Sequence, residues 1–500
     1  MSKVTIALML VAALIVGAGG MYAGMAGMQL ADTGPSQSQQ QSPPPQDQGK
    51  KQNQNQKKNN NGDKASDVSF ETVRQAFETM SERFYKDIDK DQLLNGAIHG
   101  MVKALDDRFS VYMDPETARQ FTQSLSSSYE GIGAEVSLVN GVVTIMSPFK
   151  NSPADKAGLR ANDKILSING KSISDLNLYE AVQKIRGEGG TNVTLGIKRQ
   201  GVPDIMKIKV TRGEIPIQTV YKDTIKKDGH LFGIIEISSF SRGTAKEFSE
   251  ALSSLESKGM DGLVIDVRGN PGGYLGSVLK IGNEIIPKKE PIVQIEDRYG
   301  NQERHFSTLT EKKDYPIVGL INGGSASAAE ILSAALKEAA GYPLVGQKSF
   351  GKGTVQTEFP VGGGQLKLTI AKWLTPDGNW INKKGIKPKY KVKQPDYFYT
   401  HPITVKEDEA LTYNENGDRI QNAQVMLEGL GFDTGRHDGY FNEKTKEAVK
   451  AFQKINDLPV TGKIDSKTAS MLDQKILQAV DQNKNDLQLQ TALSVLEKHF

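Results

Sequence analysis

The N-terminal segment contains a long uncharged run, and this run constrains the chain more than any other feature. Lys3 is followed by residues 4–28, in which no acidic or basic side chain occurs. As a helix, a run of this length is long enough to cross about 30 Å of hydrocarbon. Residues 1–31 are therefore predicted to be a signal anchor or a signal peptide, and the chain is predicted to be exported.

Two features bear on whether this segment is kept. Its most apolar part ends near Val16, and the stretch Val16-Gly17-Ala18 has the small residues of a signal-peptide cleavage site. Gly20 and Gly24 instead lie four residues apart, a spacing that lets two membrane helices pack closely. We favour a single-pass anchor in a bacterial cell membrane with the rest of the chain extracytoplasmic. Cleavage would make the protein secreted.

Residues 32–67 consist mainly of Gln, Asn, Pro, Ser and Lys. Such a segment cannot bury enough apolar surface to offset the entropy lost on ordering, so we expect a disordered linker. After a membrane segment, the linker would hold the folded domains away from the bilayer.

Length and composition limit what the rest of the chain can be. A chain of 500 residues is too long for one hydrophobic core, so several domains are expected. Its 62 basic and 59 acidic side chains leave a net charge of +3, which indicates no nucleic-acid partner. The absence of cysteine excludes disulfides, thiolate metal sites and cysteine nucleophiles. We expect neither a metal nor a cofactor.

Residues 68–127 show helical periodicity. Apolar residues recur at spacings of three and four in two stretches, which are Phe70, Val73, Phe77, Met80 and Leu94, Ile98, Met101, Val102. Such apolar faces need a partner. Either this helical arm packs on the following domain, or it is a dimerisation arm that makes the protein a homodimer.

Residues 128–212 resemble a PDZ domain in their order of strands, glycine-rich turns and one helix. The resemblance rests on the segments SPADKAGL and ILSING, on strands at 135–138, 142–147 and 193–198, and on a helix at 178–185. In that fold a glycine-rich loop binds the C-terminal carboxylate of a peptide, which adds as a strand to the sheet edge. The resemblance places peptide binding at Gly131, Ile132, Gly133, Ala134 and, after the helix, Arg186. Arg186 could instead cap the helix carbonyls.

The next segment, residues 213–400, has the pattern of an α/β core. Apolar strands are predicted at 231–237, 262–267 and 315–322, with an amphipathic helix at 244–258. The second strand ends in DVRGNPGG, whose glycines would let backbone N–H groups approach a substrate oxygen. The loop could equally be a simple tight turn.

The third strand runs into GGSASAAE and then an Ala- and Leu-rich helix. We expect Ser325 to be the N-cap of this helix. Ser327 would then lie in the first turn, where unpaired N–H groups and the helix dipole stabilise a developing oxyanion. Ser327 is therefore the candidate nucleophile.

A serine nucleophile needs a base, and none of the six histidines is well placed to provide it. A lysine can take that role when burial favours its neutral amine. Lys352, between two glycines in FGKGTVQ, has no acid near it in sequence. Gln356, four residues on, could hold the lysine amine through its carbonyl oxygen. Lys352 could otherwise be a solvated loop residue.

The combination of GGSASAAEI, FGKGTVQ, DVRGNPGG and LTPDGNWINKKGIKP with a preceding PDZ-like unit resembles the carboxy-terminal processing (tail-specific) proteases over residues 68–391. This resemblance implies an α/β and α+β multidomain fold whose ClpP/crotonase-like protease core carries an inserted PDZ domain. It also implies that Ser327 is the nucleophile, Lys352 the base and Gln356 its support, with the oxyanion bound by the amides of Gly272 and Ala328. Many family members carry an aspartate where this chain has Glu338, which leaves only a possible accessory role for that acid.

Residues 401–480 resemble a small three-helix peptidoglycan-binding domain. The resemblance rests on Asp438-Gly439, Phe441, Thr445, Ala448-Val449, Phe452-Gln453 and Gly462. Asn442 departs from the glycine usual after that phenylalanine, which bears on ligand binding. The domain could instead be a structural or dimerising appendage. Residues 481–500 are predicted to form a further amphipathic helix, which could be an interface.

Taken together, these features favour a serine endopeptidase of the carboxy-terminal processing type that cleaves extracytoplasmic proteins by a Ser-Lys mechanism. Its partners would be proteins or peptides with accessible C-termini, and peptidoglycan. One alternative is a catalytically silent PDZ and wall-binding scaffold. Another, a peptidoglycan hydrolase, lacks the expected zinc-ligand or paired-carboxylate spacing.

Overall fold

The computed structural model describes residues 70–125, 128–139, 141–149, 151–200, 202–287 and 290–500. The described chain divides into two compact units, residues 70–112 and residues 113–500. The expected anchor and linker, residues 1–67, lie outside the described residues. Among the helices that are described, none combines the length and the apolar character needed to cross a bilayer.

The first unit is built from α2 (Glu71–Arg83) and α3 (Lys90–Lys103). Asp89 caps α3 by accepting hydrogen bonds from the N–H groups of Asp91 and Gln92. Neither helix has a buried side chain. Their apolar faces, which include Phe70 and Met101, are thus exposed in this unit.

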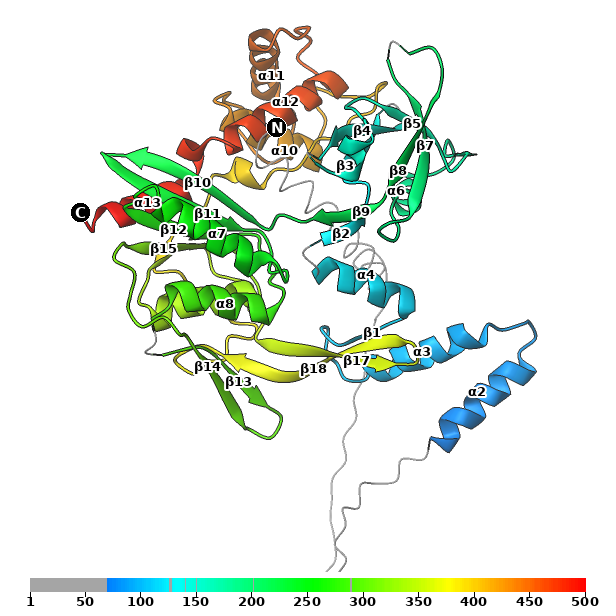
Figure 1. Cartoon of the computed structure of the whole chain (residues 1–500). Coiled ribbons are helices and arrows are strands. Elements are labelled where there is room, and N and C mark those ends of the chain that lie inside the picture. Colours follow the sequence, from blue (N-terminus) through cyan, green and yellow to red (C-terminus); the bar gives the residue numbers. More distant parts are fainter. Residues whose placement is uncertain (1–69, 126–127, 140, 150, 201, 288–289) are drawn as a thin grey trace, which may run out of the picture. The chain divides into compact units, whose positions relative to one another are not determined.

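The protease-like part of the second unit is an α/β domain around a six-stranded sheet (Figure 1). Only β10 runs antiparallel to its neighbour, and the other paired strands are parallel. The two central strands, β12 (Gly262–Asp266) and β15 (Ile317–Ile321), are buried at every residue, as their apolar sequences predict. In order across the sheet, the strands are β10 (Val220–Lys227), β11 (His230–Ile237), β12 (Gly262–Asp266), β15 (Ile317–Ile321), β16 (Leu344–Gly346) and β19 (Tyr390–Lys391).

Helices cover both faces of this sheet. One face packs on α7 (Thr244–Glu256), α8 (Leu275–Ile285) and α9 (Ala328–Ala334), which continues into a π-helical turn (Ala335–Ala339). The other face packs on α13 (Leu487–Glu497), the last helix of the chain. An antiparallel sheet of β14 (Gln302–Phe306), β13 (Pro291–Asp297), β18 (Gly364–Leu374) and β17 (Thr354–Val361) joins this domain.

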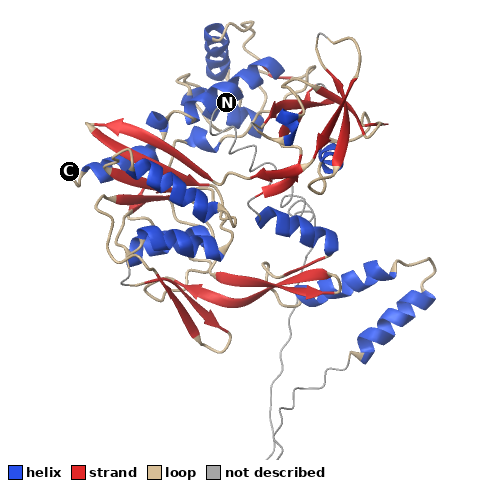
Figure 2. Ribbon diagram, viewed as in Figure 1, coloured by secondary structure: helices blue, strands red, loops and turns tan. Residues whose placement is uncertain are grey.

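The PDZ-like part has its own core and its own antiparallel sheet (Figure 2). The helix α6 (Leu178–Ile185) has the bounds expected from sequence, and Asn177 and Glu180 form a capping box at its start. The sheet order is β3 (Ala134–Val139), β4 (Val142–Pro148), β5 (Lys164–Ile168), β7 (Asn192–Lys198) and β8 (Met206–Thr211), with β6 (Lys171–Ser172) beside β5. A ribbon of β2 (Ser128–Gly131) and β9 (Gly213–Pro216) follows α4 (Pro115–Leu125), and α5 (Pro153–Lys156) follows β4.

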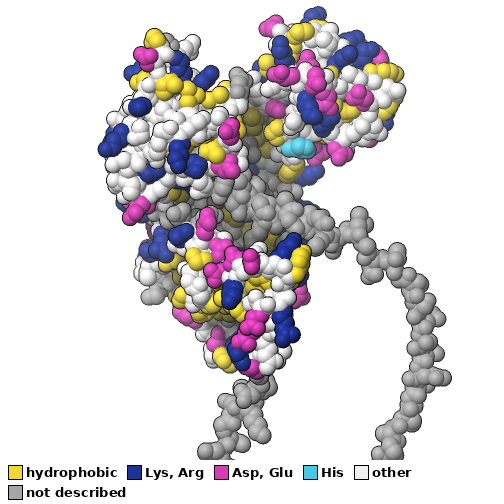
Figure 3. Space-filling view, turned by 90° about the vertical axis from the view of Figure 1, so that its right-hand side faces the viewer, with side chains coloured by type: hydrophobic (Ala, Val, Ile, Leu, Met, Phe, Trp, Pro, Cys, Tyr) yellow, Lys and Arg dark blue, Asp and Glu magenta, His cyan; other side chains and the backbone are white. Residues whose placement is uncertain are grey.

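The C-terminal domain packs α10 (Asp418–Gly429), α11 (Glu443–Ile455) and α12 (Ser466–Val480) around Phe441 and Phe452. A short ribbon of β20 (Ala410–Leu411) and β21 (Ile464–Asp465) closes it. Three helices are thus present where the sequence predicts three. On the face shown in Figure 3, acidic and basic side chains are scattered among one another, with apolar side chains between some of them.

Candidate active site

Ser327 occupies a strained turn between β15 and α9. It is the N-cap residue of α9 and has φ 52° and ψ −114°, a backbone conformation that side chains other than glycine rarely adopt. Its side chain is half-buried. The expectation that Ser327 lies inside the first turn is wrong by one position, because Ser327 has a positive φ and the helix begins at Ala328.

Ser325 does not cap α9, which corrects the second expectation for this segment. Its hydroxyl donates to the carbonyl of Val267 at 2.7 Å and accepts from the N–H of Asn322 at 3.0 Å. Ser325 therefore connects the serine loop, residues 322–327, to the end of β12. Its burial and these two bonds leave it no role at the helix end.

A buried carboxylate joins the serine loop to the lysine loop. Glu330 has no exposed surface, and its Oε2 accepts hydrogen bonds from the backbone N–H groups of Ser327 (3.0 Å) and Lys352 (2.8 Å). Its Oε1 accepts from the N–H of Gly351 (2.7 Å) and the hydroxyl of Ser349 (2.5 Å). Four donors thus satisfy one carboxylate. The backbone nitrogens of the candidate nucleophile and the candidate base both lie within 3.0 Å of the same oxygen atom.

The loop that carries Lys352 is fixed on its other side by two tryptophans. The indole N–H of Trp373 donates to the carbonyl of Lys352 at 2.9 Å, and that of Trp380 donates to the carbonyl of Gly353 at 2.8 Å. Lys352 itself is half-buried. Its position depends on β18, which carries Trp373, as well as on α9.

Gln356 lies on β17, four residues beyond Lys352. Its amide nitrogen donates to the hydroxyls of Thr354 (2.8 Å) and Thr369 (3.1 Å). These two bonds fix the orientation of the amide. Its carbonyl oxygen is then the end available to accept a hydrogen bond from an amine.

The NPGG loop lies directly against Ser327. A Cβ on Gly272 would stand 2.7 Å from the Cβ of Ser327 and 2.9 Å from the amide nitrogen of Ala328, and Gly272 has φ 97°. No other residue type fits there. The N–H of Ala328 donates to no acceptor among the described residues, whereas that of Gly272 donates to Oδ1 of Asn270 at 2.8 Å. Of the two expected oxyanion donors, only Ala328 is therefore uncommitted in this structure.

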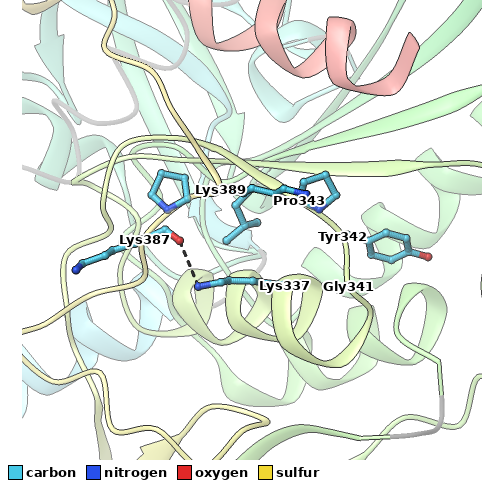
Figure 4. A pocket seen from close by; sticks show the side chains of 8 residues that line it. Lys337, Gly341, Tyr342, Pro343, Lys387 and Lys389 are labelled. Atoms are coloured by element: carbon cyan, nitrogen blue, oxygen red, sulfur yellow. Dashed lines mark hydrogen bonds between the residues drawn. The ribbon is translucent and has the colours of Figure 1, made fainter. Parts of the chain in front are cut away.

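Glu338 is not brought to this site. It lies on the π-helical turn, and its carboxylate accepts from the N–H of Asp377 at 3.1 Å. It lines a cavity of about 510 Å³ together with Lys348 and Trp380. A neighbouring cavity of about 340 Å³ contains Lys337, whose amine donates to the carbonyl of Lys387 at 3.4 Å (Figure 4). Neither Ser327 nor Lys352 lines these cavities.

The expected peptide-binding loop of the PDZ-like part precedes an open sheet edge. β3 is the terminal strand of its sheet, so its outer edge is unpaired among the described strands. Gly133, directly before β3, has φ 72°, and a Cβ there would stand 2.5 Å from that of Ser152. Ile132 and Gly133 thus connect Gly131, the last residue of β2, to Ala134, the first residue of β3.

Arg186 is the C-cap residue of α6, but it bonds the helix only through its backbone N–H, which donates to the carbonyl of Val182 at 2.9 Å, and not through its side chain. Its guanidinium lies 4.9 Å from the ring centre of Tyr129, a cation–π contact. Burial raises the pKa of Tyr129, and the positive charge of Arg186 opposes that rise. The helix carbonyls are bonded instead by Arg212, which donates to those of Ile185 (2.8 Å) and Lys184 (3.1 Å).

Sequence reasoning missed Glu330 and Asn270. Asn270 is fully buried, donates to the carbonyl of Ile237 at 2.7 Å, and accepts from the N–H of Ala326 at 2.9 Å through its backbone carbonyl. The signal for Glu330 is its place three residues after Ser327 at a helix start, the spacing of a capping box. No comparable signal points to Asn270.

Comparison with protein families matches four segments of the chain. Residues 231–392 match peptidase family S41, and residues 144–199 match a PDZ domain. Residues 416–472 match a peptidoglycan binding domain, and residues 14–117 match the N-terminal domain of the activating protease CtpB.

The chain is similar to named proteases over most of its length. It is 51% identical over 435 residues to the carboxy-terminal processing protease CtpB of Bacillus subtilis (strain 168), which covers 87% of this chain and 90% of that one. It is 41% identical over 435 residues to CtpA of the same organism, with 87% and 91% covered. A solved photosystem II D1 C-terminal processing protease is 27% identical and covers 65% of this chain and 86% of its own, with a TM-score of 0.39. The chain therefore belongs to peptidase family S41, as a carboxy-terminal processing protease with a PDZ domain and a peptidoglycan-binding-like domain.

Proposed function

We propose that this serine-type peptidase works through Ser327 as nucleophile and Lys352 as general base. The observation that carries the proposal is the Glu330 carboxylate, which accepts the backbone N–H groups of both residues through one oxygen. Two loops 25 residues apart in sequence are thereby held at one site. The strained φ of Ser327 supports the same assignment, because such strain concentrates at nucleophiles and other functional positions.

The reaction follows from these positions. The hydroxyl of Ser327 attacks the substrate carbonyl and passes its proton to the neutral amine of Lys352, which later protonates the leaving amine. Water then attacks the carbonyl of the acyl-enzyme and gives a proton to the same amine; the bond to Ser327 breaks, and the serine oxygen takes that proton back from Lys352. Gln356, held by its two threonines, would orient that amine through its carbonyl oxygen.

The negative oxygen formed in each step needs donors. The N–H of Ala328 supplies one at the start of α9, where the helix dipole adds to the effect. The N–H of Gly272 can be the second donor only if it leaves Oδ1 of Asn270 and donates to the substrate oxygen instead. We therefore propose that the NPGG loop turns slightly when substrate binds. In the absence of substrate, the side chain of Asn270 accepts the hydrogen bond from Gly272.

The substrates would be proteins or peptides with accessible C-termini. Support comes from the PDZ match and from the open edge of β3 beside the Gly131–Ala134 loop. Arg186, which stacks on Tyr129 at the end of α6, is placed by this proposal beside the bound peptide. The resulting activity is endopeptidase cleavage guided by C-terminal recognition.

The setting would be extracytoplasmic. The uncharged run at residues 4–28 supports export, and the match at residues 416–472 supports contact with peptidoglycan. The exposed apolar residues of α2 and α3, including Phe70, Phe84 and Leu94, support a homodimer formed through this arm. Light scattering of the protein with Leu94→Glu would show a monomer if the arm carries the dimer, and an unchanged mass would refute that part.

Two substitutions and one matched control test the chemistry. Ser327→Ala and Lys352→Ala should each abolish hydrolysis of a peptide with a free C-terminus while the circular dichroism spectrum stays unchanged. Lys348→Ala is the control, because this exposed lysine lies four residues earlier and lines the separate cavity. Wild-type turnover in either test variant would remove the assignment. Absence of hydrolysis by the wild-type protein across a peptide library would favour the silent scaffold.

A further inference from the structure

A buried ionic cluster lies at the end of β12, where the NPGG loop begins. The guanidinium of Arg268 donates to Asp266 through Nε (2.9 Å) and Nη2 (2.6 Å). It also donates to Asp486 through Nη1 (3.0 Å) and Nη2 (2.8 Å). The three side chains are 18%, 11% and 13% exposed, respectively. One arginine is thus shared by two carboxylates from distant parts of the chain.

Asp486 belongs to the start of α13. It is the N-cap of that helix, accepts from the N–H of Leu489 at 2.9 Å, and accepts from the amide of Gln394 at 2.5 Å. Gln488 adds a further acceptor for Arg268 at 3.0 Å. Arg268 therefore donates hydrogen bonds to three side-chain oxygens at the start of the last helix.

The rest of α13 covers the central sheet. Leu489, Ala492, Leu493, Val495 and Leu496 are buried and form one apolar cluster with Phe232, Val264, Val318, Leu320 and Val345 of the strands (Figure 1). The match to the peptidase family ends at residue 392, and the peptidoglycan-binding-like domain follows at 416–472. A helix beyond that domain thus supplies one layer of the protease core.

The cluster leads to the catalytic turn through few bonds. Arg268 is followed directly by the Gly269–Gly273 loop, and the N–H of Gly269 donates to the side chain of Asn322 at 2.8 Å. The carbonyl of Asn270 accepts from Ala326, the neighbour of Ser327, at 2.9 Å. Gly272 then lies against Ser327 itself. A shift of Arg268 would therefore move the residues that face the nucleophile.

We infer that Asp486 is a positioning residue of the peptidase: through Arg268, the C-terminal helix α13 holds the Gly269–Gly273 loop against Ser327. The peptidoglycan-binding-like domain is then tethered to the core at both ends, and a strain on it can reach the active site. The inference rests on the proposed function of Ser327.

The test compares Asp486→Asn with a control on the same helix. Glu497→Gln removes the ion pair of Glu497 with Lys227 (2.9 Å), which joins α13 to β10 rather than to the loop. Asp486→Asn should lower kcat about ten-fold, equal to about 1.4 kcal/mol of barrier, with KM changed less than about two-fold. Glu497→Gln should leave both constants unchanged. A wild-type kcat for Asp486→Asn, measured below its unfolding temperature, would overturn the inference.

Hydrogen exchange gives a readout that does not depend on catalysis. The amides of Gly269, Asn270, Gly272 and Gly273 should exchange faster in full-length Asp486→Asn than in the wild type and in Glu497→Gln. If Asp486→Asn does not fold, Asp486→Glu keeps the charge and should show the same change to a smaller extent. Unchanged exchange in this loop would refute the role of Asp486, whereas a fully active Ser327→Ala variant would instead refute the proposed dyad.

Discussion

Glu330→Gln removes the charge that joins the two catalytic loops while keeping the size of the side chain. The carboxylate accepts four hydrogen bonds, two at each oxygen, from Ser327, Lys352, Gly351 and Ser349. With its NH₂ group at the position of Oε2, the new amide cannot bond the N–H groups of Ser327 and Lys352. With its NH₂ group at the position of Oε1, it cannot bond the N–H of Gly351, whereas the hydroxyl of Ser349 can turn and accept from it. One or two bonds to a charged group are therefore lost, at about 1.5–3 kcal/mol each, so the gross loss is on the order of 1.5–6 kcal/mol.

Burying a neutral amide costs less than burying a carboxylate, which returns part of that loss. We expect a net decrease of about 1–4 kcal/mol in the free energy of unfolding and at least a hundred-fold decrease in kcat/KM. The protein offers a local probe of the first effect. Its two tryptophans, Trp373 and Trp380, both donate to the lysine loop, so urea unfolding followed by tryptophan fluorescence reports on this region.

Glu338→Gln is the matched control, since this acid lies eight residues further on and accepts from Asp377 instead. It should leave both the urea midpoint and kcat/KM near the wild-type values. If Glu330→Gln unfolds within about 0.5 kcal/mol of the wild type and retains its activity, the carboxylate does not organise the site and the reasoning fails.

Three further predictions concern the loop, the last helix and pH. Gly272→Ala places a Cβ 2.7 Å from that of Ser327, so kcat should fall about a hundred-fold in a peptidase assay; undiminished turnover would mean the loop is free to move away. Leu493→Ala empties a fully buried position between α13 and the sheet and should cost about 2–5 kcal/mol in urea unfolding, against a negligible cost for the half-exposed Leu487→Ala. Burial would raise the pKa of Asp486, but Arg268 outweighs it and lowers that pKa. The ionised Asp486 therefore stabilises the folded protein above its unfolded-state pKa of about 3.9, and this contribution is lost as the pH falls through its lower pKa in the folded state. Below pH ~4, the free energy of unfolding should fall more steeply in the wild type than in Asp486→Asn.

The sequence predicted regular structure well where local pattern decides it. The buried strands β12 and β15 were identifiable from apolar runs, and the helix α6 from the PDZ-like order of strands, turns and one helix. The position of Ser327 was predicted one residue too deep in α9, because its positive φ depends on the tertiary packing of Gly272 rather than on local preference.

Two other features could not be predicted because they depend on contacts between distant segments. Two of the four partners of Glu330 are backbone N–H groups 21 and 22 residues away, and backbone groups leave no trace in residue types. The helix α13 has an apolar face that shows it needs a partner. Its partner, the central sheet, lies across an entire intervening domain in sequence.

The transfer of a proton from Ser327 to Lys352 is the central step of the proposed mechanism, and acylation of Ser327 tests this step in isolation. The wild-type protein and Lys352→Ala would be incubated with a fluorophosphonate, and the modified peptide identified by mass spectrometry over time. The account predicts rapid single labelling at Ser327 in the wild type and labelling at least a hundred-fold slower in Lys352→Ala. Equal labelling rates in the two proteins, or modification at another serine, would contradict it.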